Sequence, residues 1–395
     1  MTPARIAIPA QQRGMGIVEV MVGILIGMIV VAAIYNVFAV AEGYKRTAVG
    51  AADAQTTGVY AQFVLRREIG NAGTAISGAG GELATCTAAD PGWPVPVGFG
   101  GPYIRPIPVL IRDGGAPNVS DSFLVTYSTA PRVITPMLFI DKPMTIGTDK
   151  FYIQSPNGFN VNDRVIAINM LGFCELTRAT AVVKGDSLGN VTTGVVGISH
   201  PGTAHLYLPG SANDGARLLN MGQVGTATRT LYDVFNGQLR TTDVFGAAPA
   251  NPIAQNVVLM KAQYGVDCGN NGVISWTTAT ATNICGDALN YTPNDFVPAV
   301  WVPGCAVCWT GPNLARIRAI RVGVVVRSDE PDLKDASLKF VNRPLPQMAL
   351  FDCSTHNALC PGRLVLDNTV LVDYYRYRTY ETIVPMINAI YNNGL

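Results

Sequence analysis

Residues 14–41 read GMGIVEVMVGILIGMIVVAAIYNVFAVA, and the charge pattern of this stretch is unusual. From Val20 to Ala41 there are 22 consecutive residues without an Asp, Glu, Lys or Arg. As a helix rising ~1.5 Å per residue, this run would be about 33 Å long, enough to cross the hydrocarbon core of a bilayer. The carboxylate of Glu19 lies just inside its N-terminal edge, and Arg5 and Arg13 precede it. The stretch therefore predicts a membrane-spanning helix that carries one acidic residue.

Two simple interpretations leave part of this stretch unexplained. A secretory signal peptide ends in a small-residue cleavage site, but this apolar run continues through Tyr35, Phe38 and Tyr44 without a proline. A plain membrane anchor accounts for the length and for the arginines, which would keep the N-terminus in the cytoplasm. It does not account for Glu19, because a carboxylate inside an apolar span costs roughly 2–3 kcal/mol and needs a partner or a role.

A third interpretation accounts for all of these features. The segment Gly14-Met15-Gly16-Ile17-Val18-Glu19-Val20 resembles the processing site of type IV prepilins and type II secretion pseudopilins. In those families a short basic leader is cut after a glycine on the cytoplasmic face, the new first residue is N-methylated, and a glutamate stands fifth. The resemblance implies that 1–14 is the leader, that Met15 is the methylated first residue, and that Glu19 serves filament assembly. Met15 is a mild departure, because the usual first residue is Phe.

Composition limits the class of protein. The chain has 395 residues, a length that can bury a sizeable core and form more than one domain. Its net charge is +1 and only 14% of its residues are charged, which argues against a nucleic-acid partner held by a basic patch. Short apolar runs split by Gly, Pro, Asn and Asp follow the first 74 residues, and they predict a β-rich remainder.

One long helix is predicted over 15–71, because no proline falls between Pro9 and Pro91 and Gly70-Asn71-Ala72-Gly73 ends it. Its first part, 15–41, is expected to span the membrane. Its second part, 42–71, is amphipathic. Four residues share an apolar face there: Ala48, Ala52, Val59 and Phe63. Charged residues are expected on the remaining surface: Glu42, Lys45, Arg46, Asp53, Arg66, Arg67 and Glu68.

Glycines within this helix predict local softness, because each costs about 1 kcal/mol relative to alanine in a helix interior. They are Gly27, Gly43, Gly50 and Gly58.

A loop-rich connector is expected at 72–106 and a β-rich globular head at 107–395. Strands are predicted at 107–111, 123–127, 151–153, 164–170, 175–183, 206–208, 230–234, 238–241, 317–328, 364–366 and 374–385. Val257–Gly265 fits a helix or a strand by pattern alone, and Asn236-Gly237 is a hairpin signal. In 317–328 the apolar side chains at even positions share one face, opposite Arg321 and Arg327. The fold class is α+β: a long N-terminal membrane and filament helix followed by a large, disulfide-containing, pilin-like head.

All eight cysteines follow the predicted membrane helix, where the compartment permits disulfides. They are Cys86, Cys174, Cys268, Cys285, Cys305, Cys308, Cys353 and Cys360. Four bridges are expected, although eight cysteines allow about 105 connectivities. Proximity in sequence favours Cys353–Cys360 and Cys268–Cys285, which leaves Cys86–Cys174 and Cys305–Cys308.

No catalytic, cofactor-binding or metal-binding residue is predicted. The pair Cys305 and Cys308 forms a CxxC motif, but the loop composition around it favours a structural bridge over a redox site. Zinc would need four ligands, and the three histidines are scattered at positions 200, 205 and 356. The acidic turn at 329–332 is expected to be a solvated loop rather than a calcium site. Tyrosines and arginines alternate in 374–380, which indicates packing within a sheet rather than ligand stacking.

The order of segments resembles the PilW family of minor pilins over nearly the whole mature chain. The matching pieces are DSFLVTYS at Asp121, NGFNVNDRVIAINMLGFCELTRAT at Asn157, LYDVFNGQLRTT at Leu231, VVLMKAQYGVD at Val257, IRAIRVGVVVRS at Ile317 and RYRTYETIVPMIN at Arg376. An insert around Cys268–Cys308 and the tail Ala389–Leu395 depart from the family pattern.

This resemblance implies a structural protein and not an enzyme: a minor pilin that primes a type IV pilus and sits near its tip. The implied partners are other minor pilins, the major pilin, the prepilin peptidase, the inner membrane and a tip adhesin. The implied location is the bacterial inner membrane, with the head in the periplasm, and later the pilus. Two alternatives stay open: a type II secretion pseudopilin of the J type, and a bitopic periplasmic enzyme or adhesin in which Glu19 is a coincidence.

The spacing from Gly14 to Glu19 predicts that the mature chain begins at Met15 with a methylated amino group. Replacing Gly14 with a bulky residue, as in Gly14→Leu, should abolish cutting, because the resemblance implies a peptidase that accepts only a small side chain there. N-terminal mass spectrometry of the mature protein measures both effects. A mature chain that starts at any other residue would contradict the prediction.

Overall fold

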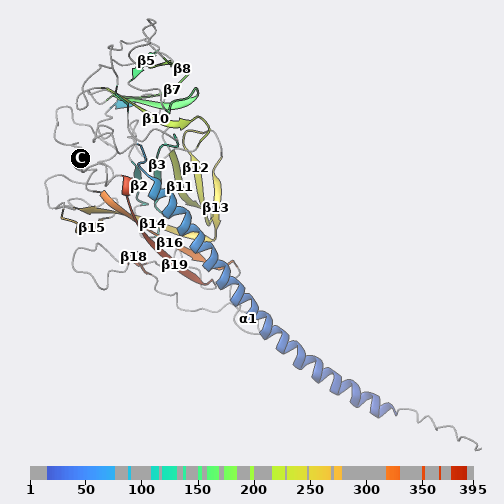
Figure 1. Cartoon of the computed structure of the whole chain (residues 1–395). Helices are drawn as coiled ribbons and strands as arrows, with labels where there is room; N and C mark the ends of the chain where they lie inside the picture. The colour runs from blue at the N-terminus through green and yellow to red at the C-terminus, as the bar shows by residue number, and fades with distance from the viewer. Residues whose placement is uncertain are drawn as a thin grey trace, which may run out of the picture.

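The computed structural model describes one long helix and a β-rich head (Figure 1). The described residues are 16–75, 88–89, 108–114, 118–130, 137–138, 150–153, 158–168, 173–184, 196–199, 216–226, 229–246, 249–267, 271–277, 317–329, 349–351, 364–365 and 375–388. This arrangement confirms the predicted order of an N-terminal apolar helix followed by a β-rich head.

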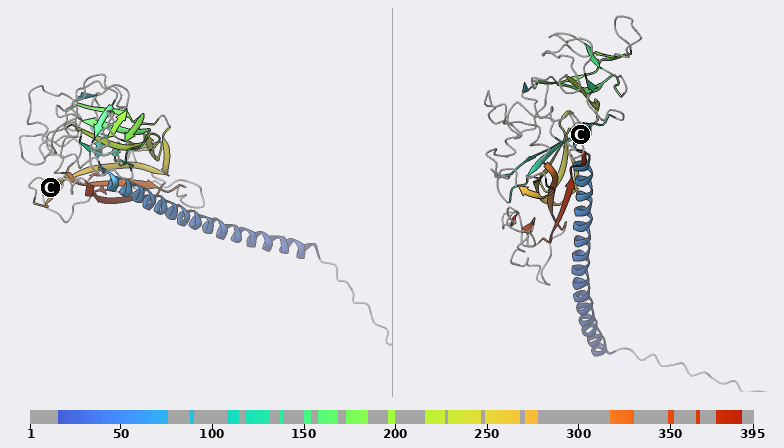
Figure 2. Two further views of the ribbon diagram at one scale, coloured as in Figure 1. Left: turned by 45° about the horizontal axis from the view of Figure 1, so that its top comes forward. Right: turned by 60° about the vertical axis from the view of Figure 1, so that its left-hand side comes forward.

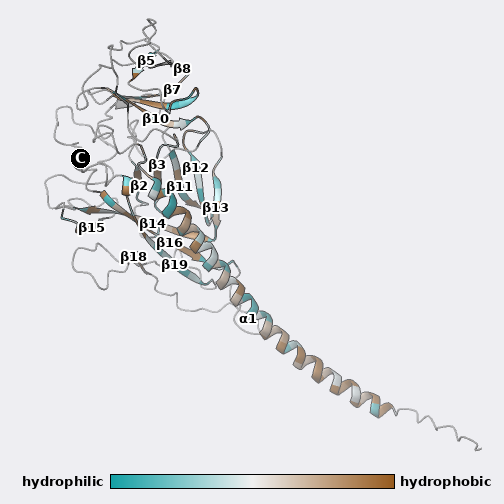
Figure 3. Ribbon diagram, viewed as in Figure 1, coloured by the Kyte–Doolittle hydropathy of each residue, from teal (hydrophilic) through white to brown (hydrophobic). Residues whose placement is uncertain are grey.

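Helix α1 spans Ile17–Asn71, 55 residues in all, which agrees with the predicted helix to within two residues at its start. Its first half leaves the head as a bare rod (Figures 1 and 2). That half is apolar (Figure 3) and long enough to cross a membrane, and none of its most apolar window is buried inside the molecule. Leu25 and Phe38 are 61% and 70% exposed. A contiguous exposed apolar surface of this kind marks a site for contact with lipid or with other apolar helices.

The end of α1 is fixed by hydrogen bonds to the head. Gly73 has a φ of 81°, a left-handed conformation that suits glycine just after a helix. The amide Nδ2 of Asn388 donates to the carbonyl oxygens of Gly70 and Ala72, at 3.3 and 3.2 Å. Carbonyls at a helix end have no partner within the helix, so Asn388, from the far end of the chain, caps α1 in tertiary structure.

The helix-bearing sheet contains four antiparallel strands and lies against α1. Its strand order is β15 (Ile274–Thr277), β14 (Val257–Asp267), β16 (Ile317–Arg327) and β19 (Tyr377–Pro385). The segment that fitted helix or strand equally is strand β14, which pairs along nearly all of β16.

The middle sheet has five antiparallel strands. Its order is β13 (Asn251–Gln255), β12 (Gln238–Asp243), β11 (Arg229–Phe235), β3 (Ser122–Thr126) and β2 (Val109–Arg112). Asn236 and Gly237 connect β11 to β12 with φ values of 50° and 71°. Two positive φ angles define the tight hairpin turn that Asn-Gly favours, so this predicted turn is confirmed.

Two distal sheets complete the far end of the head (Figure 1). The larger contains β1 (Ala88–Ala89), β7 (Phe173–Arg178), β6 (Asp163–Ile168), β10 (Arg217–Gln223) and β4 (Met137–Leu138). The smaller contains β5 (Lys150–Ile153), β9 (Val196–Ser199) and β8 (Ala181–Lys184). A two-stranded ribbon pairs β17 (Ala349–Leu350) with β18 (Leu364–Val365).

The main core is shared by α1, the helix-bearing sheet and the middle sheet. Leu65 and Ile69 of α1 are completely buried in it, as are Phe123 of β3 and Ile320 of β16. Full burial of such side chains stabilises the fold by about 1.5–3 kcal/mol each. The second half of α1 is therefore part of the head's core, whereas its first half is not.

Some strand predictions were wrong, for identifiable reasons. The predicted strand 175–183 is two strands, β7 and β8, separated at Ala179. Strand β10 was missed, since RLLNMGQ shows no alternation and its inner residues are buried on both faces. The face of β16 opposite its core face is buried as well, because Leu350 and Phe351 pack on Val325 and Arg321 is only 7% exposed.

Gly58 has a specific packing role in addition to the expected softness. A Cβ built on Gly58 would overlap the ring of Tyr380 in β19, whose hydroxyl donates to the carbonyl oxygen of Ala54 at 3.3 Å. The absence of a side chain at Gly58 thus lets the strand approach the helix closely.

We predict that Gly58→Ala lowers the free energy of unfolding of the head by about 1–3 kcal/mol, because the ring of Tyr380 must move in a packed interface. The measurement is denaturation of the mature chain in detergent. Gly43→Ala is the matched control, since a Cβ there meets nothing within 4 Å and should leave the head unchanged. Equal unfolding curves for the two variants would contradict this packing role.

Candidate assembly interface along the long helix

The second half of α1 has two different apolar sides. The side that meets the head carries small residues over 54–61, including Ala54, Gly58 and Ala61. Larger residues follow on the same side near the C-terminal end of the helix. Ala54 and Ala61 are 3% and 0% exposed. Small side chains allow a helix and a strand to approach closely, so this side forms the contact with the sheet.

The opposite side is the apolar face predicted from the sequence: Ala48, Ala52, Val59 and Phe63, called here the exposed stripe. All four are exposed, with Val59 at 54% and Phe63 at 61%. The four residues do share a face, and that face points away from the head. Exposed valine and phenylalanine at helical spacing indicate a surface that another element covers.

Polar contacts fix the rotation of α1 against the head. Glu68 is 7% exposed, and its carboxylate accepts hydrogen bonds from the Tyr127 hydroxyl at 2.9 Å and from Arg67 Nη2 at 2.6 Å. Burial, together with the nearby charge of Glu68, raises the pKa of Tyr127 to about 12. The tyrosine therefore stays protonated and donates throughout the physiological range. In addition, Gln62 Nε2 donates to the carbonyl oxygen of Glu381 at 2.6 Å.

The sequence pattern predicts that Glu68 lies on the charged outer surface of the helix, and this prediction is wrong because Glu68 is buried. Glu68 lies one helical turn from Leu65 and next to Ile69, both of which are completely buried. That spacing was the available signal, because residues three positions apart lie on the same side of a helix. With this side locked to the head, the direction of the exposed stripe is set as well.

Glu19 lies at the other end of α1, in its first turn. Its backbone N–H donates to the carbonyl oxygen of Gly16 at 2.9 Å, and its side chain is exposed. Among the described residues no hydrogen bond or ion pair reaches its carboxylate. A carboxylate in the first turn is favoured by the helix dipole. Gly14 and Met15 lie outside the described residues, so the cleavage site remains a prediction.

The predicted disulfides also fall outside the described part, apart from the backbone of Cys174. There β1 pairs in parallel with β7, which sets Ala88 opposite Phe173 and Ala89 opposite Cys174. Ala88 and Ala89 are thus paired with the strand that contains Cys174, whereas Cys86 lies outside the described residues. All four pairings stay predictions.

In the described part of the chain, no three His, Cys, Asp or Glu residues come together as a metal site would require. The three histidines and the CxxC motif lie outside that part. Of the acidic turn at 329–332, only Asp329 is described, and it accepts a hydrogen bond from Asn256 at 3.0 Å. Tyr375 and Tyr380, expected to pack within a sheet, contact the Arg327 guanidinium and helix residue Gly58 respectively.

The long helix with its exposed apolar half, the acidic residue in its first turn and the β-rich head are consistent with a type IV pilin-like fold. Two family models match the chain. The prokaryotic N-terminal methylation motif matches residues 9–35, which include Gly14, Met15 and Glu19, and the model of type IV pilus-assembly protein W matches residues 222–388.

These two matches support a PilW-family type IV pilin. The matched residues 222–388 include the helix-bearing sheet and three strands of the middle sheet. Neither the search of curated proteins nor that of solved structures returns a match. The family and the methylation motif together support a minor-pilin role, with other pilins and a prepilin peptidase as partners, and association with the membrane and the pilus.

Proposed function

We propose that this protein primes the assembly of a type IV pilus and then sits near its tip, in a structural role without catalysis. The observation that carries this proposal is the position of the head relative to α1. In Figure 1 and in the right-hand view of Figure 2, the distal sheets lie beyond the C-terminal end of the helix.

This position matters because a pilus is a head-to-tail helical assembly, in which each subunit is followed by the next along the axis. Within the shaft, the space beyond the C-terminal end of one helix is taken by the heads of subunits further toward the tip. The distal sheets would compete for that space. At the tip no subunit lies further out, so a head extended along the helix axis fits there.

The proposed path of the protein follows from its two-part helix. Before assembly the leader lies in the cytoplasm, residues 15–41 span the inner membrane and the head lies in the periplasm, where its disulfides form. On assembly the same apolar helix leaves the lipid and packs against the helices of other minor pilins and the major pilin. The exposed stripe continues this contact beyond the membrane-spanning part. A tip adhesin is a further proposed partner of the head.

Glu19 is proposed to set the axial register of this packing. Cleavage at Gly14 creates a charged amine at Met15, four residues before Glu19, and in a filament a neighbour's amine can reach the same carboxylate. An ion pair offsets the cost of holding a carboxylate in an apolar medium. Since only one stagger brings the two charges together, the pair selects one axial position.

Glu19→Ala should therefore leave cleavage, membrane insertion and head folding intact. It should lower incorporation into pili by tenfold or more, because losing the ion pair would cost about 1.4 kcal/mol or more of interaction free energy. The variant is expressed in a strain that lacks the native copy, cleavage is checked by gel shift, and sheared pili are probed for the protein.

Glu42→Ala is the matched control, because Glu42 is an exposed glutamate on the same helix whose described partner is Arg46, one turn away at 3.3 Å. It should be incorporated like the native chain. Normal incorporation of Glu19→Ala would refute the register role, and failure at the cleavage step would show that the peptidase reads Glu19.

The priming and tip role predicts that deletion of the gene reduces the number of pili per cell while the remaining pili keep their length. Pili are counted by electron microscopy, and the native chain is located with gold-labelled antibody to the head. Label at one end of each filament supports the proposal. Label along the shaft, or pili of normal number in the deletion strain, contradicts it.

A further inference from the structure

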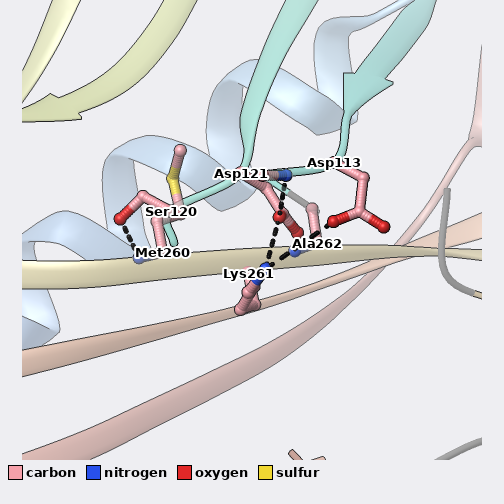
Figure 4. A network of polar contacts seen from close by, with 7 residues as sticks. Asp113, Ser120, Asp121, Met260, Lys261 and Ala262 are labelled. Atoms are coloured by element: carbon pink, nitrogen blue, oxygen red, sulfur yellow. Dashed lines mark hydrogen bonds and ion pairs between the residues drawn. The ribbon is translucent and has the colours of Figure 1, made fainter. Parts of the chain in front are cut away.

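A buried amine lies between two carboxylates where the middle sheet packs on the helix-bearing sheet (Figure 4). Lys261 belongs to β14, Asp121 immediately precedes β3 and Asp113 immediately follows β2. The side chains of Lys261 and Asp121 are 4% and 5% exposed, and that of Asp113 is 16% exposed. Neither the pilin-like architecture nor the assembly interface uses these groups.

Hydrogen bonds hold the carboxyl group of Asp121 in place beside the amine of Lys261. Lys261 Nζ lies 2.7 Å from Asp121 Oδ1 and 3.8 Å from Asp113 Oδ1. The N–H of Gly114 donates to Asp121 Oδ1 at 3.0 Å, and the N–H of Ala262 donates to Asp121 Oδ2 at 2.9 Å. The backbone N–H of Asp121 donates to the carbonyl oxygen of Met260 at 2.8 Å. The carboxyl carbon of Asp121 is thus fixed beside the amine.

The charges of the cluster do not balance. One ammonium faces two carboxylates in a site that excludes bulk water, where an unneutralised charge is costly. Desolvation raises the pKa of Asp121, and the charge of Lys261 and the two backbone N–H groups oppose that shift only in part. Asp113, the more exposed of the two acids, is the better place for the remaining negative charge. Transfer of one proton across the 2.7 Å contact, from Lys261 Nζ to Asp121, gives the combination that can react: an amine and a carboxylic acid.

We propose that Lys261 and Asp121 join in an intramolecular isopeptide bond, with Asp113 as the group that transfers the proton. Lys261 Nζ forms a bond to Cγ of Asp121, and one C–O bond of that carboxyl group breaks. Asp113 takes a proton from the amine and passes it to the leaving oxygen, which departs as water. No oxidation or reduction takes place, and one amide and one water replace one amine and one carboxylic acid.

The surroundings support each part of this step. Groups held at contact distance react with effective concentrations of roughly 10⁵–10⁸ M, which compensates for the poor reactivity of a carboxylic acid. The N–H of Ala262 points at Oδ2 and stabilises the charge that develops on this oxygen during attack. Proton transfer by a carboxylate is ordinary general acid–base catalysis; it requires Asp113 Oδ1, now 3.8 Å from the amine, to come within hydrogen-bond reach of about 2.6–3.2 Å. Release of water also removes a buried pair of charges from the core.

The bond would connect residues 140 positions apart and tie the middle sheet to the helix-bearing sheet. It would therefore join the start of β3, in the middle sheet, to β14, in the sheet that contacts α1. Such a link lies on a path by which a pull on the distal part of the head reaches the helix.

The test uses the full mature chain, purified from membranes in detergent, then denatured, reduced and alkylated so that disulfides do not affect its mass. We expect the intact mass to be lower by one water than that of the matching linear chain, and tandem mass spectrometry to find one branched peptide that contains Asp121 and Lys261. Lys261→Arg keeps the charge and should show no loss of water. Lys45→Arg, a change at an exposed helix lysine, should keep the loss.

Asp113→Asn tests the reaction without altering the packing of the head, because asparagine has nearly the same shape as aspartate and cannot accept and pass on the proton. It should give a folded head, with the native resistance to limited proteolysis, in which most chains lack the bond. A native chain at full linear mass, or Lys261 recovered in an unbranched peptide, would show an ion pair only and overturn the proposal. If a substituted chain fails to fold, the mass and the peptide map of the native chain still decide. A complete bond in Asp113→Asn would overturn the role of Asp113.

Discussion

The close contact between the second half of α1 and strands β16 and β19 is the constraint on which the rest of this structure depends. It requires small residues on the helix, such as Ala54 and Gly58, so that Tyr380 can lie against the helix backbone. Larger residues near the helix end, Leu65 and Ile69, then enter the core that the two main sheets share. The contact makes the helix a rigid part of the head and directs the exposed stripe outward.

Buried polar groups give this apolar core a unique arrangement. The hydrogen bond between Glu68 and Tyr127 connects the helix to the segment after β3. The contact between Lys261 and Asp121 connects β14 to the segment before β3. Arg321 donates to Gln263 while its guanidinium lies over the rings of Trp276 and Phe351. Such groups are costly when their partners are absent. A slipped strand or a rotated helix would separate these partners and leave the groups buried without them.

In the proposed function the same chain must be stable in lipid and in a filament, and its head and the first half of α1 meet this requirement in different ways. The head carries its own core, so its fold does not depend on what surrounds the first half of α1. The first half is apolar on all sides and can exchange lipid for other apolar helices at little cost, because the two are similarly apolar. Glu19 is the exception, since a carboxylate tolerates such an exchange only with a charged partner. The proposed assembly therefore needs no refolding of the head.

The sequence by itself determined the features that depend on local pattern: the apolar run, the processing motif with Glu19, the helix end at Asn71 and the Asn236-Gly237 hairpin. Each rests on residues close together in the chain. Only the tertiary structure decided which side of α1 meets the head, since two sides are apolar and shape complementarity to Tyr380 selects the one with Gly58. It also decided that Val257–Asp267 is a strand, because its partner β16 lies far along the chain. The Lys261–Asp121 pair was invisible for the same reason: its members are 140 residues apart, and no local pattern marks a charge that becomes buried.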